Sequence, residues 1–291
     1  MPSKGDTTEA APNFARGGGQ SVSGKVATSY SRLHPEAVYG YEDRLRKART
    51  ILAVLTDALQ RDLRPLRLLD IGASTGIIAD FLAEHFAEVI GVDVDMEAIR
   101  YARSRFRREN LAFYVGDATQ LPAANESIDV IVCAHVYEHV SDARRLLREM
   151  QRVLSTDGVC YFAAGNRLRV MEPHYRLPFL SVVPRPLGHW YVRAMGRSER
   201  YEEQHLTYWG LRKLVEDFEV LDYTRKTVER PSKFAVDYML PAGSAKQRGA
   251  KWLVDFAWWL VPSYIWVLKK RYARDRDAVG RAGLGTSVVG N

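Results

Sequence analysis

The chain has 291 residues, of which 46% are hydrophobic and 26% are charged. This composition allows one large domain with additions, or two small domains, and it excludes fibrous, collagen-like and wholly disordered proteins. The formal net charge is +7, but residues 241–291 alone hold nine basic and three acidic side chains. The rest of the chain is therefore nearly neutral, and the basic end fits an anionic membrane surface as well as nucleic acid.

The first residues and the cysteines bear on localisation. Residues 1–28 are rich in Gly, Ser, Thr, Ala and Pro, so we expect a disordered tail there. This stretch has no apolar run of the kind that directs secretion. Cys133 and Cys160 both lie in apolar runs, which excludes a disulfide scaffold and favours a reducing compartment. We expect a cytoplasmic protein, with peripheral attachment to the inner face of a membrane as an alternative.

Helical and strand-like stretches alternate along the middle of the chain. Apolar residues recur at helical spacing from Leu45 to Leu59, ahead of the first strand. Five apolar runs then predict strands, with amphipathic stretches between them: residues 66–71, 88–93, 111–117, 128–134 and 158–164. Two further strands are predicted within 218–228 and 232–240. This rhythm is typical of an α/β protein with a mostly parallel sheet, which binds its ligand beyond the carboxyl ends of the strands.

Residues 166–205 interrupt this rhythm. They hold four prolines among aromatic residues and arginines, which predicts an inserted lid of short helices. Its apolar residues favour an apolar or amphiphilic acceptor, with phosphate or carboxylate groups held by arginines: Arg167, Arg169, Arg176 and Arg185. The alternative is that the apolar residues pack the insert onto the core while the arginines are solvated.

Residues 241–291 form a basic, Trp-rich tail. Residues 252–268 contain four of the six tryptophans and are flanked by cations, so we expect an amphipathic helix lying in a membrane interface. Asp255 and Pro262 make this stretch a poor membrane span. The predicted contact is residues 251–271 on an anionic membrane surface. Packing of this helix on the core and homodimer formation are the alternatives.

The strongest chemical signal is the stretch LLDIGASTGIIADFLA. A strand ends near Asp70, and Gly72 and Gly76 follow in a tight turn that leads into a helix. A glycine-rich turn alone serves a dinucleotide, a nucleoside or only packing. Asp93 closes the second strand, where an acid accepts hydrogen bonds from ribose hydroxyls, and Asp117 follows the third, where an acid accepts from an adenine amino group. Three strand-end acids around one glycine turn therefore predict a nucleoside-cofactor site.

With these residues the sequence resembles the class I S-adenosylmethionine (SAM)-dependent methyltransferases. The matching stretches are LLDIGASTG, VIGVDVDMEAIRYAR, FYVGDATQLPAANESIDVIVCAHVYEHVSD and LLREMQRVLSTDGVCYF. The branch it resembles most is the small-molecule branch that includes ubiquinone- and menaquinone-pathway enzymes. The resemblance implies a Rossmann-like seven-stranded sheet in a methyltransferase domain spanning residues 29–240, with SAM as cofactor.

The resemblance also implies roles for individual residues. Asp70, Gly72 and Gly76 would surround the amino acid part of SAM, Asp93 would bind the ribose, and Met96 would lie on the adenine face. The predicted cofactor site comprises Asp70, Gly72, Ala73, Ser74, Gly76, Asp93, Val94, Met96, Asp117, Ala118 and His135. Ser74 stands where the family often has glycine. AHVYEH follows the fourth strand in place of an Asn-Pro-Pro-Tyr motif, which argues against the DNA enzymes that methylate amino groups.

Three histidines are the predicted catalytic bases: His135, His139 and His205. The alternatives are that Glu138 and His139 orient the loop and cap the following helix, and that His205 caps its own helix. A divalent metal held by His135, Glu138 and His139 would fit their spacing, but no further ligand is evident, so no metal site is predicted.

These features predict a methyltransferase for a small or lipid-linked acceptor near a membrane. A hydroxyl oxygen is the favoured acceptor atom, because histidines are available to take its proton. Carbon methylation of a quinone-like ring and methylation of a glycan are the alternatives. An RNA or protein methyltransferase is disfavoured because no added nucleic-acid-binding module is evident. A protein that binds SAM without catalysis remains the alternative from another class.

Overall fold

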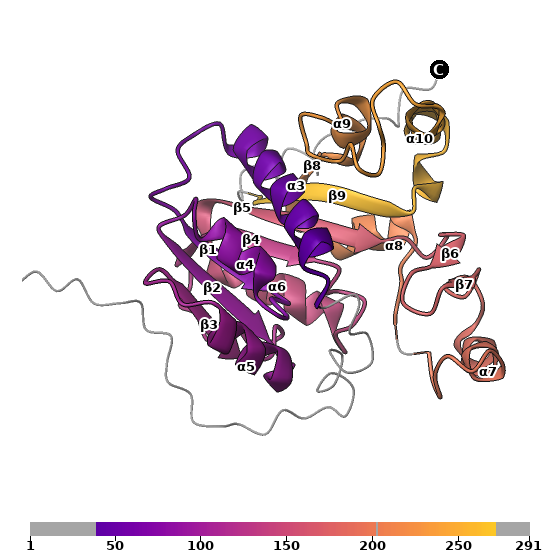
Figure 1. Ribbon diagram of the computed structural model, residues 1–291, viewed down its shortest axis with the longest axis horizontal. Coiled ribbons are helices and arrows are strands. Elements are labelled where there is room, and N and C mark those ends of the chain that lie inside the picture. Colours follow the sequence, from indigo (N-terminus) through magenta and orange to yellow (C-terminus); the bar gives the residue numbers. More distant parts are fainter. Residues whose placement is uncertain (1–38, 202, 272–291) are drawn as a thin grey trace, which may run out of the picture.

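The computed structural model describes residues 39–201 and 203–271. The predicted disordered tail at residues 1–28 lies outside this range, as do residues 272–291. The central feature is a seven-stranded sheet in the order β3-β2-β1-β4-β5-β9-β8 (Figure 1). Its strands are β1 (Arg67–Ile71), β2 (Glu88–Asp93), β3 (Leu111–Val115), β4 (Ile128–Ala134), β5 (Leu154–Gly165), β8 (Phe218–Asp222) and β9 (Ser263–Lys270).

Strands β1 to β5 pair in parallel, and β9 runs antiparallel to both β5 and β8. The apolar runs in β1, β2, β4 and β5 are almost entirely buried because helices cover both faces of the sheet. The predicted mostly parallel, seven-stranded α/β fold is therefore confirmed.

Two hydrophobic cores lie on opposite faces of the sheet. Helices α3 (Tyr41–Leu59), α4 (Ile77–Leu82) and α5 (Met96–Arg105) pack on one face. The other face is covered by α6 (Ala143–Val153), α8 (Tyr208–Leu214), α9 (Thr224–Glu229) and α10 (Ala245–Phe256). The strand order reverses between the neighbours β1 and β4, because β2 and β3 lie beyond β1 while β5 lies beyond β4. The carboxyl ends of β1 and β4 therefore mark the point where a ligand of this fold binds.

The insert leaves the sheet at the end of β5. It contains a small ladder of β6 (Met171–Glu172) and β7 (Leu177–Pro178), followed by α7 (Arg185–Ala194). The insert has its own apolar cluster: Tyr175, Leu177, Leu180, Val192 and Tyr201. The prediction that the insert consists of short helices was wrong for the residues before α7. The chain closes a turn between β6 and β7 instead, where the Tyr175 N–H donates to Glu172 Oε2 at 2.8 Å.

The predicted amphipathic helix at residues 252–268 was also wrong. Helix α10 ends at Phe256, a short 3₁₀ turn η1 (Trp258–Leu260) follows, and β9 begins after Pro262. Pro262 cannot continue a helix, and Trp266 and Val267 are buried between neighbouring strands. The strand predicted within 232–240 was wrong, because these residues form turns and β9 is the seventh strand instead. Residues 241–291 are therefore not a separate tail, because β9 lies between β5 and β8 in the sheet of the domain.

Asn166 joins this C-terminal segment to the end of β5. Its Nδ2 donates to Trp259 O at 2.7 Å and Val261 O at 2.9 Å, and its Oδ1 accepts from Leu168 N at 3.0 Å. Among the described residues, no helix combines the length and the apolar character that a membrane crossing requires.

Candidate functional site

The glycine turn after β1 has a backbone that only glycine accommodates at two positions. Gly72 and Gly76 have φ of +76° and +79°, in the left-handed region. A Cβ at Gly72 would lie 2.6 Å from Val136 Cγ2, and one at Gly76 would lie 2.6 Å from Phe113 Cζ. Ser74 also has a positive φ of 51°, in the left-handed region that favours glycine. The sequence-predicted turn is therefore present and tightly constrained.

Asp93 holds this turn against β2. Its Oδ2 accepts from Ser74 N at 2.8 Å, and its Oδ1 accepts from Asp95 N at 2.9 Å. Burial raises the pKa of the Asp93 carboxyl, although these two backbone hydrogen bonds oppose the shift. Asp93 thus shapes the turn in addition to the ribose contact predicted for it.

Asp70 carries a buried oxygen that no group in the described protein satisfies. The residue is 3% exposed, and its Oδ2 has no hydrogen-bond partner. Burial raises the pKa of Asp70 to about 7, nearby Asp93 adds to the rise, and Arg44 opposes it. A buried, unpaired carboxylate oxygen costs free energy unless a donor or cation reaches it. This oxygen therefore indicates a ligand with such a group.

Arg44 is a site residue that the sequence analysis missed. It lies in the first turns of α3, and its Nη2 donates to Ser74 Oγ at 3.5 Å. No local pattern singles it out among the arginines of this helix, because its proximity to the turn follows from the packing of α3 against α4.

The predicted adenine contacts lie at the ends of β2 and β3. Asp93 pairs with Val115 in the sheet, and Asp117 follows two residues later. Asp117 is exposed and its Oδ1 accepts from Thr119 N at 2.7 Å, whereas Ala118 is buried. The Met96 side chain is exposed at the start of α5, and Val94 is half-buried. The contacts of these residues with a cofactor stay predictions.

His135 stands directly after β4, next to the end of β1. Its φ is +58°, and its backbone N–H donates to Ala163 O at 2.8 Å. His135 Nδ1 lies 3.3 Å from Glu138 Oε1, and 37% of the His135 side chain is exposed. Burial would raise the pKa of Glu138, but the hydrogen bond with His135 and the charges of nearby histidines lower it to about 2. An ionised, buried carboxylate thus holds one nitrogen of a partly exposed imidazole.

The other two predicted bases have different surroundings. Burial lowers the pKa of His139 to about 4, so its ring is neutral at physiological pH. His205 is buried, and neither of its ring nitrogens has a hydrogen-bond partner among the described residues. The alternative in which these histidines cap the following helices was wrong, because Asp142 caps α6, accepting from Arg145 N at 2.9 Å, and Thr207 caps α8.

Two insert arginines contact the protein itself. Arg167 Nε donates to Ser181 O at 3.2 Å, and the buried Arg169 donates through Nη2 to Pro262 O at 3.0 Å. Arg169 is therefore not solvated, whereas Arg167 is exposed and also joins two parts of the insert.

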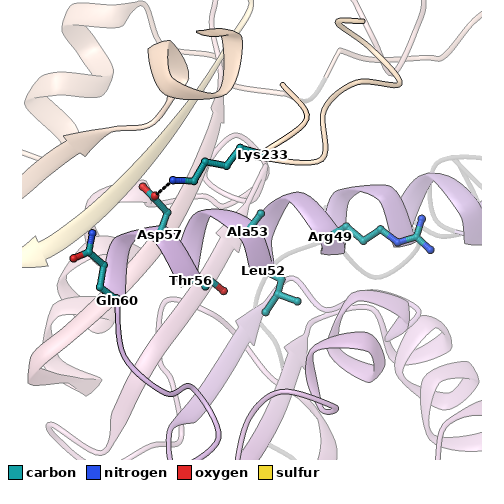
Figure 2. Close-up of a pocket in the computed structure, with 7 residues that line it drawn as sticks. All are labelled: Arg49, Leu52, Ala53, Thr56, Asp57, Gln60 and Lys233. Atoms are coloured by element: carbon teal, nitrogen blue, oxygen red, sulfur yellow. Dashed lines mark hydrogen bonds and ion pairs between the residues drawn. The ribbon is translucent and has the colours of Figure 1, made fainter. Parts of the chain in front are cut away.

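A groove of about 480 Å³ lies elsewhere, on the outer face of α3. Figure 2 shows Asp57 and Lys233 joined across it by an ion pair, with Nζ 2.5 Å from Oδ1. The groove contains none of the predicted site residues, so it is separate from the candidate cofactor site.

Comparisons with known proteins match the part of the chain that builds the site. The family described as "Methyltransferase domain" matches residues 69–162, from β1 into β5. The demethylmenaquinone methyltransferase of Thermotoga maritima is 32% identical over 137 residues, which are 46% of this chain and 56% of that protein. The probable S-adenosylmethionine-dependent methyltransferase Rv3030 of Mycobacterium tuberculosis is 35% identical over 101 residues, which are 35% of this chain and 36% of that protein. The chain thus spans less than two thirds of the length of these relatives.

A solved structure shares the fold over most of the chain. The PH0226 protein of Pyrococcus horikoshii OT3 aligns with a TM-score of 0.54, covering 84% of this chain and 99% of that one at 18% identity. Similarity at this identity concerns the fold alone, and it covers a larger share of the chain than the family match does.

Proposed function

Because this chain carries a class I SAM-dependent methyltransferase domain, we propose that it transfers the methyl group of SAM to a hydroxyl oxygen of a small or lipid-linked acceptor. The observation that carries the proposal is the His135–Glu138 pair at the end of β4, beside the glycine turn that follows β1. This pair supports a role as base, because the partly exposed imidazole lies at the same end of the sheet as the cofactor turn.

The residues at the turn fit SAM. Asp70 offers a buried, unpaired carboxylate oxygen to the cationic amino group, and Arg44 lies at the same turn, where the carboxylate of the amino acid part would be held. Asp93 is left with lone pairs beyond its two backbone contacts, which suits ribose hydroxyls. When bound, SAM supplies an electrophilic methyl group.

In the proposed reaction His135 takes the acceptor proton. With its Nδ1–H donating to Glu138, the other ring nitrogen has a lone pair that accepts the hydroxyl proton as the oxygen bonds to the methyl carbon. Glu138 fixes the tautomer and stabilises the imidazolium that forms. The products are a methyl ether and S-adenosylhomocysteine, and the proton then passes from His135 to solvent.

Exposed apolar side chains support a lipid-linked acceptor and peripheral contact with a membrane. They are found on the insert and on the C-terminal segment: Phe179, Leu187, Trp190, Trp252, Phe256 and Trp258. In Figure 1 the insert, η1 and α10 all lie at the right of the view, where β5 ends and β9 begins. Exposed tryptophans near cations are typical of side chains that enter a membrane interface.

The test begins with calorimetric titration of the protein with SAM and S-adenosylhomocysteine. Labelled SAM is then incubated with quinol, glycan and lipid extracts, and the labelled product is isolated. A methyl ether supports the proposal. A methyl group on ring carbon contradicts oxygen methylation, and cofactor binding without turnover in any extract favours the non-catalytic alternative.

A further inference from the structure

A compact group of four ionisable side chains lies where the insert returns to the core. Glu172 ends β6, His174 follows two residues later, and Glu203 and His205 precede α8. Glu172 Oε1 lies 2.7 Å from His174 Nδ1 and 3.7 Å from His205 Nε2. His174 Nδ1 lies 3.9 Å from Glu203 Oε1. One ligand atom from each of Glu172, His174 and His205 falls within 4.8 Å of the other two.

This group is buried and contains polar atoms that the described protein does not satisfy. Glu172, Glu203 and His205 are 0%, 4% and 7% exposed. Neither ring nitrogen of His205 has a hydrogen-bond partner, and Glu203 Oε2 has none. Buried polar atoms are rarely left unpaired, so an unpaired imidazole pointing at a carboxylate indicates a missing ligand between them.

Gly165 makes room for the His205 ring. A Cβ at Gly165 would lie 3.2 Å from His205 Cε1 and Nδ1, and equally close to Arg169 Nη1. The end of β5 therefore lets the imidazole approach the backbone closely, with Nε2 on the side of Glu172.

We propose that Glu172, His174 and His205, with Glu203 as a fourth donor, bind a divalent transition-metal ion of the Zn²⁺ type. Two imidazoles with carboxylates are a donor set that Zn²⁺ favours, whereas Mg²⁺ and Ca²⁺ prefer oxygen donors throughout. A tetrahedral ion with bonds of about 2.0 Å separates its donors by about 3.3 Å. Three donor separations, of 2.7, 3.7 and 3.9 Å, each differ from this value by less than an ångström. The shortest is the hydrogen bond between His174 and Glu172, which the ion would replace.

The ion would join the insert to the loop that carries the proposed base. The Gln204 N–H donates to Glu138 O at 2.9 Å, and the His139 and His174 rings meet edge to face with centroids 5.2 Å apart. The site uses neither His135 nor the cofactor turn, so metal binding and methyl transfer can be tested separately.

The experiment uses the full chain, stripped with a chelator and titrated with Co²⁺ as a spectroscopic stand-in for Zn²⁺. We expect one Co²⁺ per chain with the visible absorption of a tetrahedral site, its displacement by Zn²⁺, and a higher Tm with Zn²⁺ than with Mg²⁺. A folded protein that binds no stoichiometric Co²⁺ or Zn²⁺ would overturn the proposal.

A matched pair of variants locates the ion. His205→Gln removes a ring that makes no hydrogen bond to the residues the structure describes, so we expect the variant to fold and to bind Co²⁺ at least about 10-fold more weakly. His85 lies just after α4, outside the proposed metal site. The control variant His85→Gln should therefore bind Co²⁺ as tightly as the unmodified chain does. If His205→Gln does not fold, Glu203→Gln provides the same comparison. Unchanged Co²⁺ affinity in the folded variant would contradict the assignment.

Discussion

At the scale of single residues, the site depends on charged groups that the fold leaves incompletely paired. Asp70 is buried with a free oxygen, and Glu138 is buried with one oxygen beside His135 and the other unpaired. Such groups lower the stability of the free protein and favour a bound ligand, which is typical of functional sites.

The raised pKa of Asp70 predicts a pH dependence of SAM binding. Because that pKa is about 7, the carboxyl is largely protonated at about pH 6, and binding a cationic amino group must release a proton. Affinity should therefore rise with pH and level off above about pH 8. Calorimetry at about pH 6 in two buffers of different ionisation enthalpy measures the release.

The free energy of unfolding should depend on pH in the opposite direction to SAM affinity. The pKa of Asp70 is higher in the folded protein than its ordinary value of 3.8, so its contribution to the free energy of unfolding is present at acid pH and is lost as the pH rises through about 7. Asp70→Asn should flatten this dependence and abolish the proton release, whereas the exposed Asp62→Asn should change neither. If the Asp70→Asn variant still releases a proton on binding SAM, another group is the source of that proton.

His135→Gln should lower kcat far more than it weakens SAM binding. Removing a general base lowers kcat by about 10²- to 10⁴-fold, whereas His135 supplies only one of the predicted cofactor contacts, and calorimetry with SAM separates the two effects. His85→Gln is the control for histidine loss. Wild-type turnover by His135→Gln would remove this residue from the mechanism.

At the scale of elements, two connections decide how the C-terminal half is built. The β5–β9 pairing brings residues about a hundred positions apart into one register, from Val159↔Lys269 to Gly165↔Ser263. The insert then leaves from the same end of β5, so β9, η1 and the insert are neighbours through Asn166.

Asn166→Ala should destabilise the fold. It leaves the part-buried carbonyl of Trp259 and the buried carbonyl of Val261 without this donor, so we expect the free energy of unfolding to fall by about 2 to 4 kcal/mol. Urea denaturation measures the change. The exposed Asn125→Ala loses one contact with Arg152 and should cost at most about 1 kcal/mol. Equal effects of the two substitutions would show that Asn166 does not fix this segment.

The exposed apolar residues of α7 should mediate vesicle binding. Leu187→Ser combined with Trp190→Ser removes two side chains that are 57% and 67% exposed, so folding should be unchanged while co-sedimentation with anionic vesicles falls several-fold. Tyr238→Ser, an exposed aromatic beside Arg46 on α3, is the control. Undiminished sedimentation of the double variant would argue against α7 as the contact.

At the scale of the whole molecule, the sheet gathers the cofactor turn, the proposed base and the insert at one end. β1 and β4 are neighbours, so the loops that follow them lie together, and β5 adds the insert beside β4. Cofactor, acceptor and lipid contacts are therefore proposed for the same end of the protein, while the groove on α3 contains none of these residues.

The sequence by itself determined what depends on local pattern. Alternating strands and helices predict strands β1 to β5, and Gly72 and Gly76 predict a turn whose positive φ angles only glycine adopts without strain. The acids at the strand ends and His135 were predicted for the same reason, because their positions follow from where each strand stops.

Only the tertiary structure decided what depends on distant partners. The apolar run before Lys269 has no clear period, and a buried strand and a buried helix look alike in such a run until β5 and β8 provide edges to pair with. Arg44 reaches Ser74 through helix packing, and Glu172 meets His205 through the return of the insert. Contacts of this kind join residues that are distant in the sequence. Local spacing does not determine them, because many tertiary arrangements are compatible with the same local propensities.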